Sequence, residues 1–395
     1  MKNFLTVVIG GGASGLCAAI TLARLGDRVI VCEKTTKLGK KILASGNGRC
    51  NLMNDALSET YYNTNAHALV KSVFDRFGRT EILGFFKNLG LEVYSQNGRA
   101  FPVTNQAASV LRILEMELHR LSVPVEFNFN CSAIVPFGID LSVKSTQGKS
   151  IECRRVILTG GGKSYPAYGS DGSAYAIAAR LGHTIIEPVP SAVPLVINER
   201  LCHALQGQRI FATAKSIIGG QPSEVITGEL LFTKYGLSGT CIIDVSEPIS
   251  IALNRRHEQD VALEIDLVPF MELTRLKDEL ANRKKKKWSP ADMLSGILPE
   301  KLSVALKYLF ETRQVEQAAE QLKKWRFSVT ETRGWNEAEF TAGGVEVSEV
   351  TWGTLESKLV PGVHFAGEVL DVSGPRGGYN LAWAWASGCV AAMPW

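Results

Sequence analysis

The sequence lacks the patterns that mark metal centres, disulfide frameworks and membrane spans. It has eight cysteines, but they are scattered, and no two of them are separated by only two residues. This usage indicates neither a zinc site nor a set of disulfides and is typical of a reducing compartment, so we expect a cytoplasmic protein without a metal. No run of about 18 apolar residues could span a membrane, and we expect no membrane partner.

Charge and histidine are also too sparse to indicate several classes of function. The formal net charge is only +4 over 395 residues, which does not favour a nucleic acid as partner, although the run Arg283 to Lys287 followed by Trp288 is locally basic. We interpret this run as a solvated loop or helix end. The six histidines are dispersed, and we find no Ser-His-Asp set for nucleophilic catalysis.

The most informative motif that is present lies in the first 33 residues. An apolar run, 5–9, leads into Gly10-Gly-Gly-Ala-Ser-Gly15, which is followed by an amphipathic stretch, a second apolar run, 29–32, and Glu33. This pattern predicts a strand, a glycine turn, a helix and a strand that ends in an acid. Such a unit binds the pyrophosphate of an adenine dinucleotide at the N-terminus of its helix.

Each residue type in this motif has a physical role. Gly10 allows the tight turn, Gly12 lets the pyrophosphate approach the backbone, and Gly15 lets helix and strand pack closely. Glu33 is placed to accept hydrogen bonds from a ribose 2′-hydroxyl group, which disfavours a 2′-phosphate there. The alternative is an ordinary strand–helix–strand turn without a ligand.

Two later segments also place glycines directly after a predicted strand. Residues 155–158 lead into Thr159-Gly160-Gly161, and residues 362–366 lead into Gly367-Glu368. A glycine-rich stretch, 374–380, then precedes a final helix, 381–392. We expect these two strands and the first strand, 5–9, to meet in one sheet.

The glycine motifs lie in the first and last parts of the chain, and the sequence pattern between them differs, which predicts a domain interrupted by an insert. We expect an α/β fold with a Rossmann-like dinucleotide-binding domain that is split in sequence into residues 1–188 and 336–395. Residues 189–270 alternate apolar and polar side chains in short runs, which predicts an inserted antiparallel β-barrel-like substrate domain. Residues 271–335 carry helical spacing and predict a small helical module. The sequence leaves the oligomeric state open.

Four segments together carry a family resemblance that covers essentially the whole chain. The chain resembles the BaiN-like (YhiN-like) NAD(P)/FAD-dependent oxidoreductases of the two-dinucleotide-binding-domain flavoprotein superfamily in residues 39–51, 98–104, 228–239 and 366–374. The resemblance implies FAD as cofactor, with Glu368 near the pyrophosphate and ribityl chain and the insert over the flavin. Lys234 stands where a His is common in that family.

The expected cofactor-binding residues combine the three glycine motifs with the segment around Gly46 to Asn51, which should pass close to the flavin ring. Arg49 would contact the pyrophosphate or a substrate anion, Asn51 would hold a ring heteroatom, and Cys50 is interpreted as a packing or flavin-facing residue. The full set is Gly10, Gly12, Ala13, Ser14, Gly15, Glu33, Lys34, Lys41, Gly46, Asn47, Gly48, Arg49, Cys50, Asn51, Ala133, Thr159, Gly160, Gly161, Gly367, Glu368, Gly378, Tyr379, Asn380 and Leu381.

The candidates for the substrate face are Lys234, Tyr235 and Tyr379, because an ammonium or a phenol can bind a carbonyl or carboxylate. The helix that begins near Asn380 should point its N-terminus at the N1/O2 edge of the flavin and stabilise negative charge there. We therefore expect an FAD-dependent oxidoreductase, a reductase or an amine-oxidase-like enzyme. It would move a hydride between a small organic substrate and flavin N5, with NAD(P)H, bound transiently, or O₂ as the other redox partner. Two alternatives stay open: a flavin-dependent RNA-modifying enzyme and a non-catalytic flavin-binding redox sensor.

Overall fold

The computed structural model describes residues 5–394. The chain divides into two compact units, of which unit 1 comprises Met1–Pro188 with Phe340–Trp395 and unit 2 comprises Val189–Glu339. The two connections between the units run through β11 (Ile185–Ser191) and β20 (Phe340–Val345), which pair with each other.

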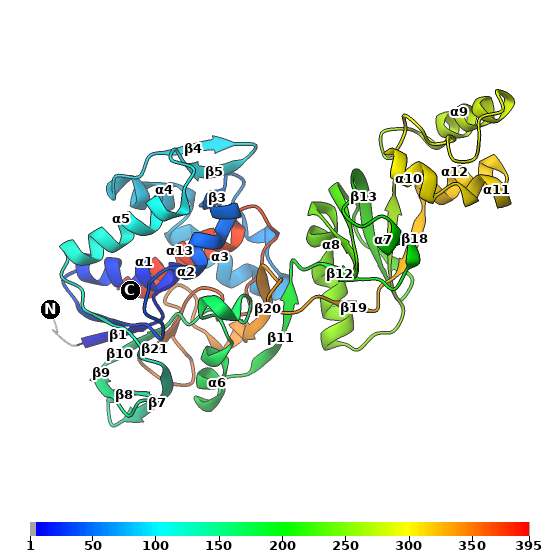
Figure 1. The fold of residues 1–395 in the computed structure, drawn as a ribbon. Helices are drawn as coiled ribbons and strands as arrows, with labels where there is room; N and C mark the ends of the chain where they lie inside the picture. Colours follow the sequence, from blue (N-terminus) through cyan, green and yellow to red (C-terminus); the bar gives the residue numbers. More distant parts are fainter. Residues whose placement is uncertain (1–4, 395) are drawn as a thin grey trace. The chain divides into compact units, whose positions relative to one another are not determined.

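Unit 1 is built on a parallel five-stranded sheet in the order β21-β10-β1-β2-β6 (Figure 1). Its strands are β1 (Leu5–Ile9), β2 (Arg28–Cys32), β6 (Val125–Glu126), β10 (Arg155–Leu158) and β21 (Val363–Phe365). The register aligns the last residues of four strands, because Ile9 pairs with both Cys32 and Leu158, and Leu158 pairs with Phe365. The residues that follow these strands therefore meet at one edge of the sheet.

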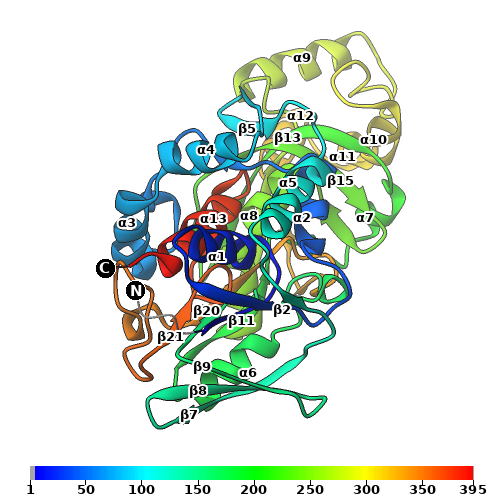
Figure 2. The same ribbon diagram turned by 90° about the vertical axis from the view of Figure 1, so that its left-hand side faces the viewer.

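Helices cover one face of this sheet. Helix α1 packs on α13, although the two are more than 350 residues apart, and both lie on the face opposite to the small β7–β8–β9 sheet (Figures 1 and 2). The helices of unit 1 are α1 (Ala13–Arg24), α2 (Lys40–Ala44), α3 (His67–Arg76), α4 (Arg79–Asn88), α5 (Ala107–Arg120), α6 (Ser173–Arg180) and α13 (Tyr379–Ala392). Buried hydrophobic side chains of β1, α1 and α13, including Trp383 and Trp385, contribute to the core.

Two small antiparallel sheets complete unit 1. One is ordered β3-β5-β4 and consists of β3 (Met53–Asn54), β4 (Val93–Gln96) and β5 (Arg99–Pro102). The other consists of β7 (Cys131–Phe137), β8 (Asp140–Ser145) and β9 (Ser150–Cys153). The first of these sheets packs against α13 through β3.

Unit 2 has an antiparallel sheet and a group of helices that share one hydrophobic core. The sheet runs in the order β18-β17-β13-β15-β16-β12-β19, with β14 paired to β13. Its strands are β12 (Leu195–Val196), β13 (Arg209–Ile218), β14 (Gln221–Pro222), β15 (Ile226–Thr233), β16 (Gly236–Ser238), β17 (Val261–Asp266), β18 (Trp325–Ser328) and β19 (Glu331–Thr332). The helices are α7 (Arg200–Ala204), α8 (Thr240–Ser250), α9 (Leu273–Lys285), α10 (Glu300–Ala305), α11 (Tyr308–Thr312) and α12 (Val315–Lys323).

The predicted fold class is confirmed: the chain is α/β, with a parallel Rossmann-type sheet and a separate antiparallel sheet. The division of the inserted part into a strand module, 189–270, and a helical module, 271–335, stays a prediction. The sequence interpretation of the basic run is wrong for one residue. Arg283 is not solvated but 9% exposed, because its guanidinium donates to the carbonyl oxygens of Met293 and Ser295, whereas Lys284 to Lys287 are exposed.

Candidate functional site

The glycine turn after β1 is tightly packed on one side and open on the other. Gly10 has a φ of +106°, and a Cβ atom on it would lie 2.6 Å from the carbonyl oxygen of Thr159. A Cβ atom on Gly15 would overlap the carbonyl oxygen of Gly10, so α1 packs directly on the turn. A Cβ atom on Gly12 would meet nothing within 4 Å among the residues described. The open side of Gly12 therefore leaves room for a ligand.

The start of α1 is suited to bind an anion. Gly12 is its N-cap, no side chain among residues 5–394 caps the helix, and its first turn contains no acidic residue. The unpaired N–H groups of this turn and the helix dipole favour a diphosphate there. Ala13 and Ser14 form the turn, and Ser14 Oγ donates a hydrogen bond to the carbonyl oxygen of Ala366, at the end of β21.

Glu33 fixes the loop that follows β2 and is 9% exposed. One carboxylate oxygen accepts a hydrogen bond from the backbone N–H of Gly11 and the other accepts one from Thr35, each at 2.8 Å. A carboxylate offers about four lone-pair positions, so acceptor capacity remains for a ribose hydroxyl group. The Glu33 carboxylate thus contacts the glycine turn directly.

The other two glycine motifs meet this turn at the same edge of the sheet. The Thr159 hydroxyl lies 2.9 Å from the carbonyl oxygen of Gly10. Gly160 packs against α6, and Gly161 and Gly367 have φ values of +73° and +79°. In open α/β sheets, ligands bind outside the carboxyl ends of the strands, which is where these residues lie.

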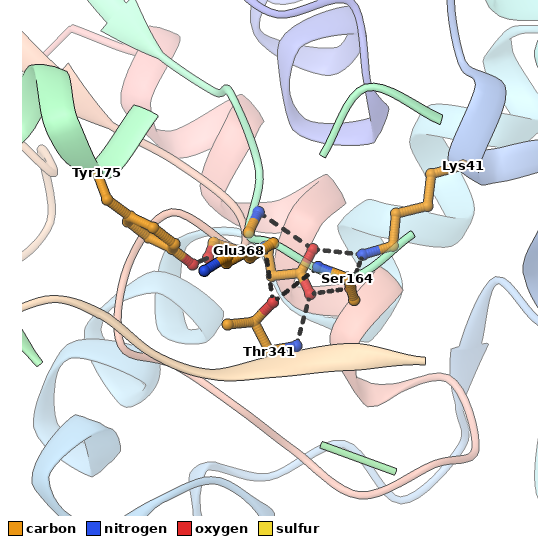
Figure 3. Close-up of polar contacts among 7 residues, drawn as sticks. Lys41, Ser164, Tyr175, Thr341 and Glu368 are labelled. Atoms are coloured by element: carbon orange, nitrogen blue, oxygen red, sulfur yellow. Dashed lines mark hydrogen bonds and ion pairs between the residues drawn. The ribbon is translucent and has the colours of Figure 1, made fainter. Parts of the chain in front are cut away.

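A polar cluster surrounds Glu368, directly after Gly367 (Figure 3). One Glu368 oxygen pairs with Lys41 Nζ at 2.7 Å. The other accepts hydrogen bonds from the Thr341 N–H at 2.9 Å and from Ser164 Oγ at 3.2 Å. Thr341 Oγ1 in turn accepts the N–H of Ser164, so three distant segments hold one carboxylate in a fixed position.

The segment 45–51 forms an irregular turn that ends in a buried polar group. Gly46, Asn47 and Cys50 have positive φ values of 54–58°. Asn51 is 8% exposed, and its Oδ1 has no hydrogen-bond partner within residues 5–394. Because an unpaired buried acceptor costs about 1–3 kcal/mol, this oxygen indicates a ligand with a donor such as an N–H group. The N3–H of a flavin ring is such a donor.

Two neighbours of Asn51 have different environments. Arg49 is exposed, and its guanidinium lies 4.9 Å from the centre of the Phe101 ring. Cys50 is fully buried, and burial raises the pKa of its thiol to about 12. The thiol is therefore protonated at neutral pH and is a poor nucleophile.

The start of α13 lies against β3. Gly377 and Gly378 have φ values of +124° and +106°, and a Cβ atom on Gly378 would overlap the backbone of Met53. Asn380 holds the preceding loop, because its side chain accepts the N–H of Gly374 and donates to the carbonyl oxygen of the same residue. Tyr379 and Leu381 are in the first turn of α13, so this part of the predicted set surrounds one helix N-terminus.

The whole chain matches one family of proteins. Residues 4–394 match the family described as HI0933-like protein Rossmann domain. The chain belongs to this HI0933-like family. A 3-dehydro-bile acid delta(4,6)-reductase of Clostridium scindens is 37% identical over 97% of this chain and 97% of its own length. A ribosomal RNA dihydrouridine synthase of Haemophilus influenzae is 29% identical over 98% of this chain and 97% of its own length.

Among solved structures, a 3-ketosteroid delta1-dehydrogenase of Sterolibacterium denitrificans has the same fold, with a TM-score of 0.52, 13% identity and 99% of both chains covered. The predicted membership in the BaiN-like family is confirmed. This HI0933-like protein is a flavoprotein oxidoreductase.

Not all predicted site residues of this HI0933-like protein lie together. Lys34 Nζ binds Asp171, in the loop before α6, and Ser173, the first residue of that helix. Ala133 lies on β7 and is partly buried. Lys234 and Tyr235 belong to unit 2, in the turn between β15 and β16. Lys41 lies in α2, and the predicted residues 46–51 follow that helix. The other predicted residues lie at the carboxyl edge of the parallel sheet or at the start of α13, and the roles of all of them toward a cofactor stay predictions.

Sequence reasoning missed Ser164, Thr341 and Tyr175, whose hydroxyl groups contribute to the Glu368 cluster. Tyr175 Oη donates to the carbonyl oxygen of Glu368 at 3.3 Å. None of the three lies in a motif, although Ser164 follows the predicted Thr159-Gly-Gly turn closely. Within residues 5–394, no group of three or more His, Cys, Asp or Glu side chains could hold a metal ion. No helix in that range is both long enough and apolar enough to cross a membrane.

Proposed function

We propose that this protein is an FAD-dependent reductase that saturates a carbon–carbon double bond conjugated to a carbonyl group in a small organic substrate. The names of two relatives support this reaction type. One reduces a bile acid that carries a ketone at carbon 3, and the other makes dihydrouridine, in which the double bond beside the uracil carbonyl is saturated. NAD(P)H is the proposed reductant.

The residues at the carboxyl edge of the parallel sheet fit FAD. The N–H groups at Gly12 would hold the diphosphate, Glu33 the adenosine ribose, and Glu368 with Lys41 the ribityl side of the cofactor. Asn51 Oδ1, which is buried and unpaired, would accept the ring N3–H. When bound, the flavin supplies a hydride at N5.

One observation carries the proposal most directly. Asn51 Oδ1 is buried and unpaired two residues before Met53, whose backbone packs on Gly378, the N-cap of α13. A buried acceptor close to a helix N-terminus would suit the edge of a flavin ring that becomes negatively charged on reduction. Cys50 beside it is protonated, so the thiol does not carry the redox step.

The test is an anaerobic stopped-flow experiment on the purified yellow protein. Heat-released cofactor should be FAD, NADH or NADPH should bleach it, and cyclohex-2-enone or a 3-oxo-Δ4 steroid should restore the yellow colour. FMN in the supernatant would overturn the cofactor assignment. Bleaching by amines, with recovery only in O₂, would show an oxidase instead of a reductase.

A second candidate function places the reduced double bond in a uracil of RNA. Lys284 to Lys287 are exposed at the end of α9, and the exposed Trp288 lies under the Arg283 guanidinium at 4.6 Å. Exposed cations beside an aromatic ring fit a phosphate backbone and an unpaired base. Replacing the four lysines with glutamine should weaken binding to a single-stranded ribosomal RNA fragment and flatten its salt dependence. Unchanged binding would leave the small-molecule substrate.

A further inference from the structure

The N-terminus of α13 is accompanied by a pair of phenols. The rings of Tyr61 and Tyr379 have centroids 4.7 Å apart and an interplanar angle of 33°, so the two phenols lie side by side. A third tyrosine fixes the position of this pair, because Tyr62 Oη donates to the carbonyl oxygen of Tyr379 at 2.8 Å. The first residue of the helix is thus held on both its ring and its backbone.

The two phenols differ in their access to water. Tyr379 is 6% exposed and Tyr61 is 43% exposed. Burial and the neighbouring Tyr61 raise the pKa of Tyr379 to about 12, against a smaller opposing effect of Arg99. The Tyr379 phenol therefore keeps its proton at neutral pH and can donate it, while the Tyr61 hydroxyl can exchange protons with solvent.

Saturation of a carbonyl-conjugated double bond needs a proton as well as a hydride. The hydride adds to the carbon β to the carbonyl, the π electrons move toward the carbonyl oxygen, and a proton must then form a bond to the α carbon. Cys50 is fully buried, so its thiol cannot regain a proton directly from water, and the carboxylate of Glu33 accepts two backbone N–H groups. The phenol of Tyr379, the first residue of α13, is a buried acid that lies beside the exposed phenol of Tyr61.

We infer that Tyr379 donates the proton to the α carbon and that Tyr61 relays its replacement from water. This inference rests on the proposed function. In the step, the O–H bond of Tyr379 breaks as the C–H bond of the product forms, and the proton of Tyr61 restores Tyr379. The two electrons come from NAD(P)H through the hydride, so the substrate is reduced and the nicotinamide is oxidised.

The test compares Tyr379→Phe and Tyr61→Phe with the holoenzyme, because phenylalanine keeps the ring and removes only the hydroxyl group. Tyr379→Phe should slow the reoxidation of the reduced enzyme by cyclohex-2-enone on the order of 10²–10⁴-fold, the usual contribution of a general acid. Its reduction by NADPH should be unchanged. The matched control is Tyr94→Phe, whose hydroxyl bonds Asn105 on the surface of the same unit and which should behave as wild type.

Tyr61 acts through Tyr379, so it is a positioning and relay residue and needs its own readout. Tyr61→Phe should be slower than wild type, and added imidazole buffer at constant ionic strength should restore its rate, because a small acid can enter at the exposed position. A merely structural loss would not respond to buffer. Neither wild type nor Tyr94→Phe should be accelerated.

A measurement without turnover keeps the inference falsifiable if a variant is unstable. In the holoenzyme labelled with ¹³C at the ζ carbon of its nine tyrosines, the Tyr379 resonance should titrate at a high pH, and its midpoint should fall in Tyr61→Phe. An unchanged Tyr379 midpoint in Tyr61→Phe would overturn the relay, and a wild-type rate of reoxidation of Tyr379→Phe by the enone would overturn the role of Tyr379 as proton donor. Either result would leave the proposed function in place. A wild-type enzyme that no enone reoxidises would overturn the proposed function, and the relay with it.

Discussion

Replacement of Glu33 by Gln tests how the acid at the end of β2 holds the glycine turn. The carboxylate accepts the N–H groups of Gly11 and Thr35, one on each oxygen, at 2.8 Å. A glutamine keeps only one acceptor oxygen, so in either orientation one N–H faces the amide NH₂ group. Loss of one hydrogen bond to a charged group in this buried position should lower the free energy of unfolding by about 1.5–3 kcal/mol.

The same change should weaken FAD binding, because the ribose hydroxyl would lose a charged acceptor. A loss of about 1.5–3 kcal/mol corresponds to a dissociation constant that is roughly 10- to 150-fold higher. Urea unfolding of the FAD-free protein measures the first effect, and titration of flavin fluorescence measures the second. The control is Glu126→Gln on the adjacent β6, whose carboxylate pairs with the exposed Lys149 and which should change stability by no more than about 0.5 kcal/mol.

The two measurements separate the two roles of Glu33. A lower stability with unchanged FAD affinity would show that the acid supports the loop and does not face the ribose. If neither quantity differs from wild type, the hydrogen bonds to Gly11 and Thr35 contribute nothing and the reasoning is refuted.

Three further changes have outcomes of known sign. Gly12→Val should abolish FAD binding and leave the urea midpoint of the FAD-free protein nearly unchanged, because its Cβ atom meets no described residue and would occupy only the ligand's approach path. The pKa of Glu117 is lowered to about 2, chiefly by Arg120, so its stabilising contribution is present above about pH 4.5 and is lost as the pH falls toward 2. Glu117→Gln should therefore remove up to about 3 kcal/mol of pH-dependent stability across that window in acid unfolding curves. If the stability of the variant depends on pH as that of wild type does, the ion pair of Glu117 contributes nothing. Asn380→Asp puts a negative charge in the first turn of α13 and should lower the midpoint potential of the bound flavin, and a potential that rises would show that the helix points elsewhere.

The choice of Asn380 for this test comes from the structure. An acid at Gly378 would be the obvious probe from sequence, since the residue precedes the helix directly. In the structure its Cβ atom would overlap the backbone of Met53, and its φ of +106° disfavours any side chain. Such a variant would disturb β3 and α13 together and would report on folding instead of on the flavin.

The parts of the site that the sequence predicts are those set by short-range geometry. The turn from Gly10 to Gly15 needs glycine at fixed positions, and the strand, helix and acid around it follow within 33 residues, so local pattern is sufficient. The strand ends at Thr159 and Gly367 are marked in the same way. In each case the backbone itself forms the binding surface.

The remaining parts depend on contacts between distant segments. Glu368 is held by Lys41, Ser164 and Thr341, which come from α2, the loop after β10 and β20, and no local spacing indicates that these meet. Tyr61 was missed for a similar reason, because it lies in a three-residue 3₁₀ turn, Glu59–Tyr61, that has no periodicity to mark it. Side-chain partners of this kind are set by tertiary packing.

The packing of α13 on α1 also has a consequence for folding during translation. Gly388 lies directly on the backbone of Ser14, and β21 completes the parallel sheet beside β10. At about 5–20 residues per second, α1 waits roughly 20–70 s for the helix that covers it. During that interval unit 2 has emerged whole and can close its own core, while the apolar side of α1 stays exposed to chaperones and to aggregation. We therefore expect cofactor loading to follow translation, and a premature stop before residue 379 to leave every earlier glycine motif in place without the helix that packs on α1.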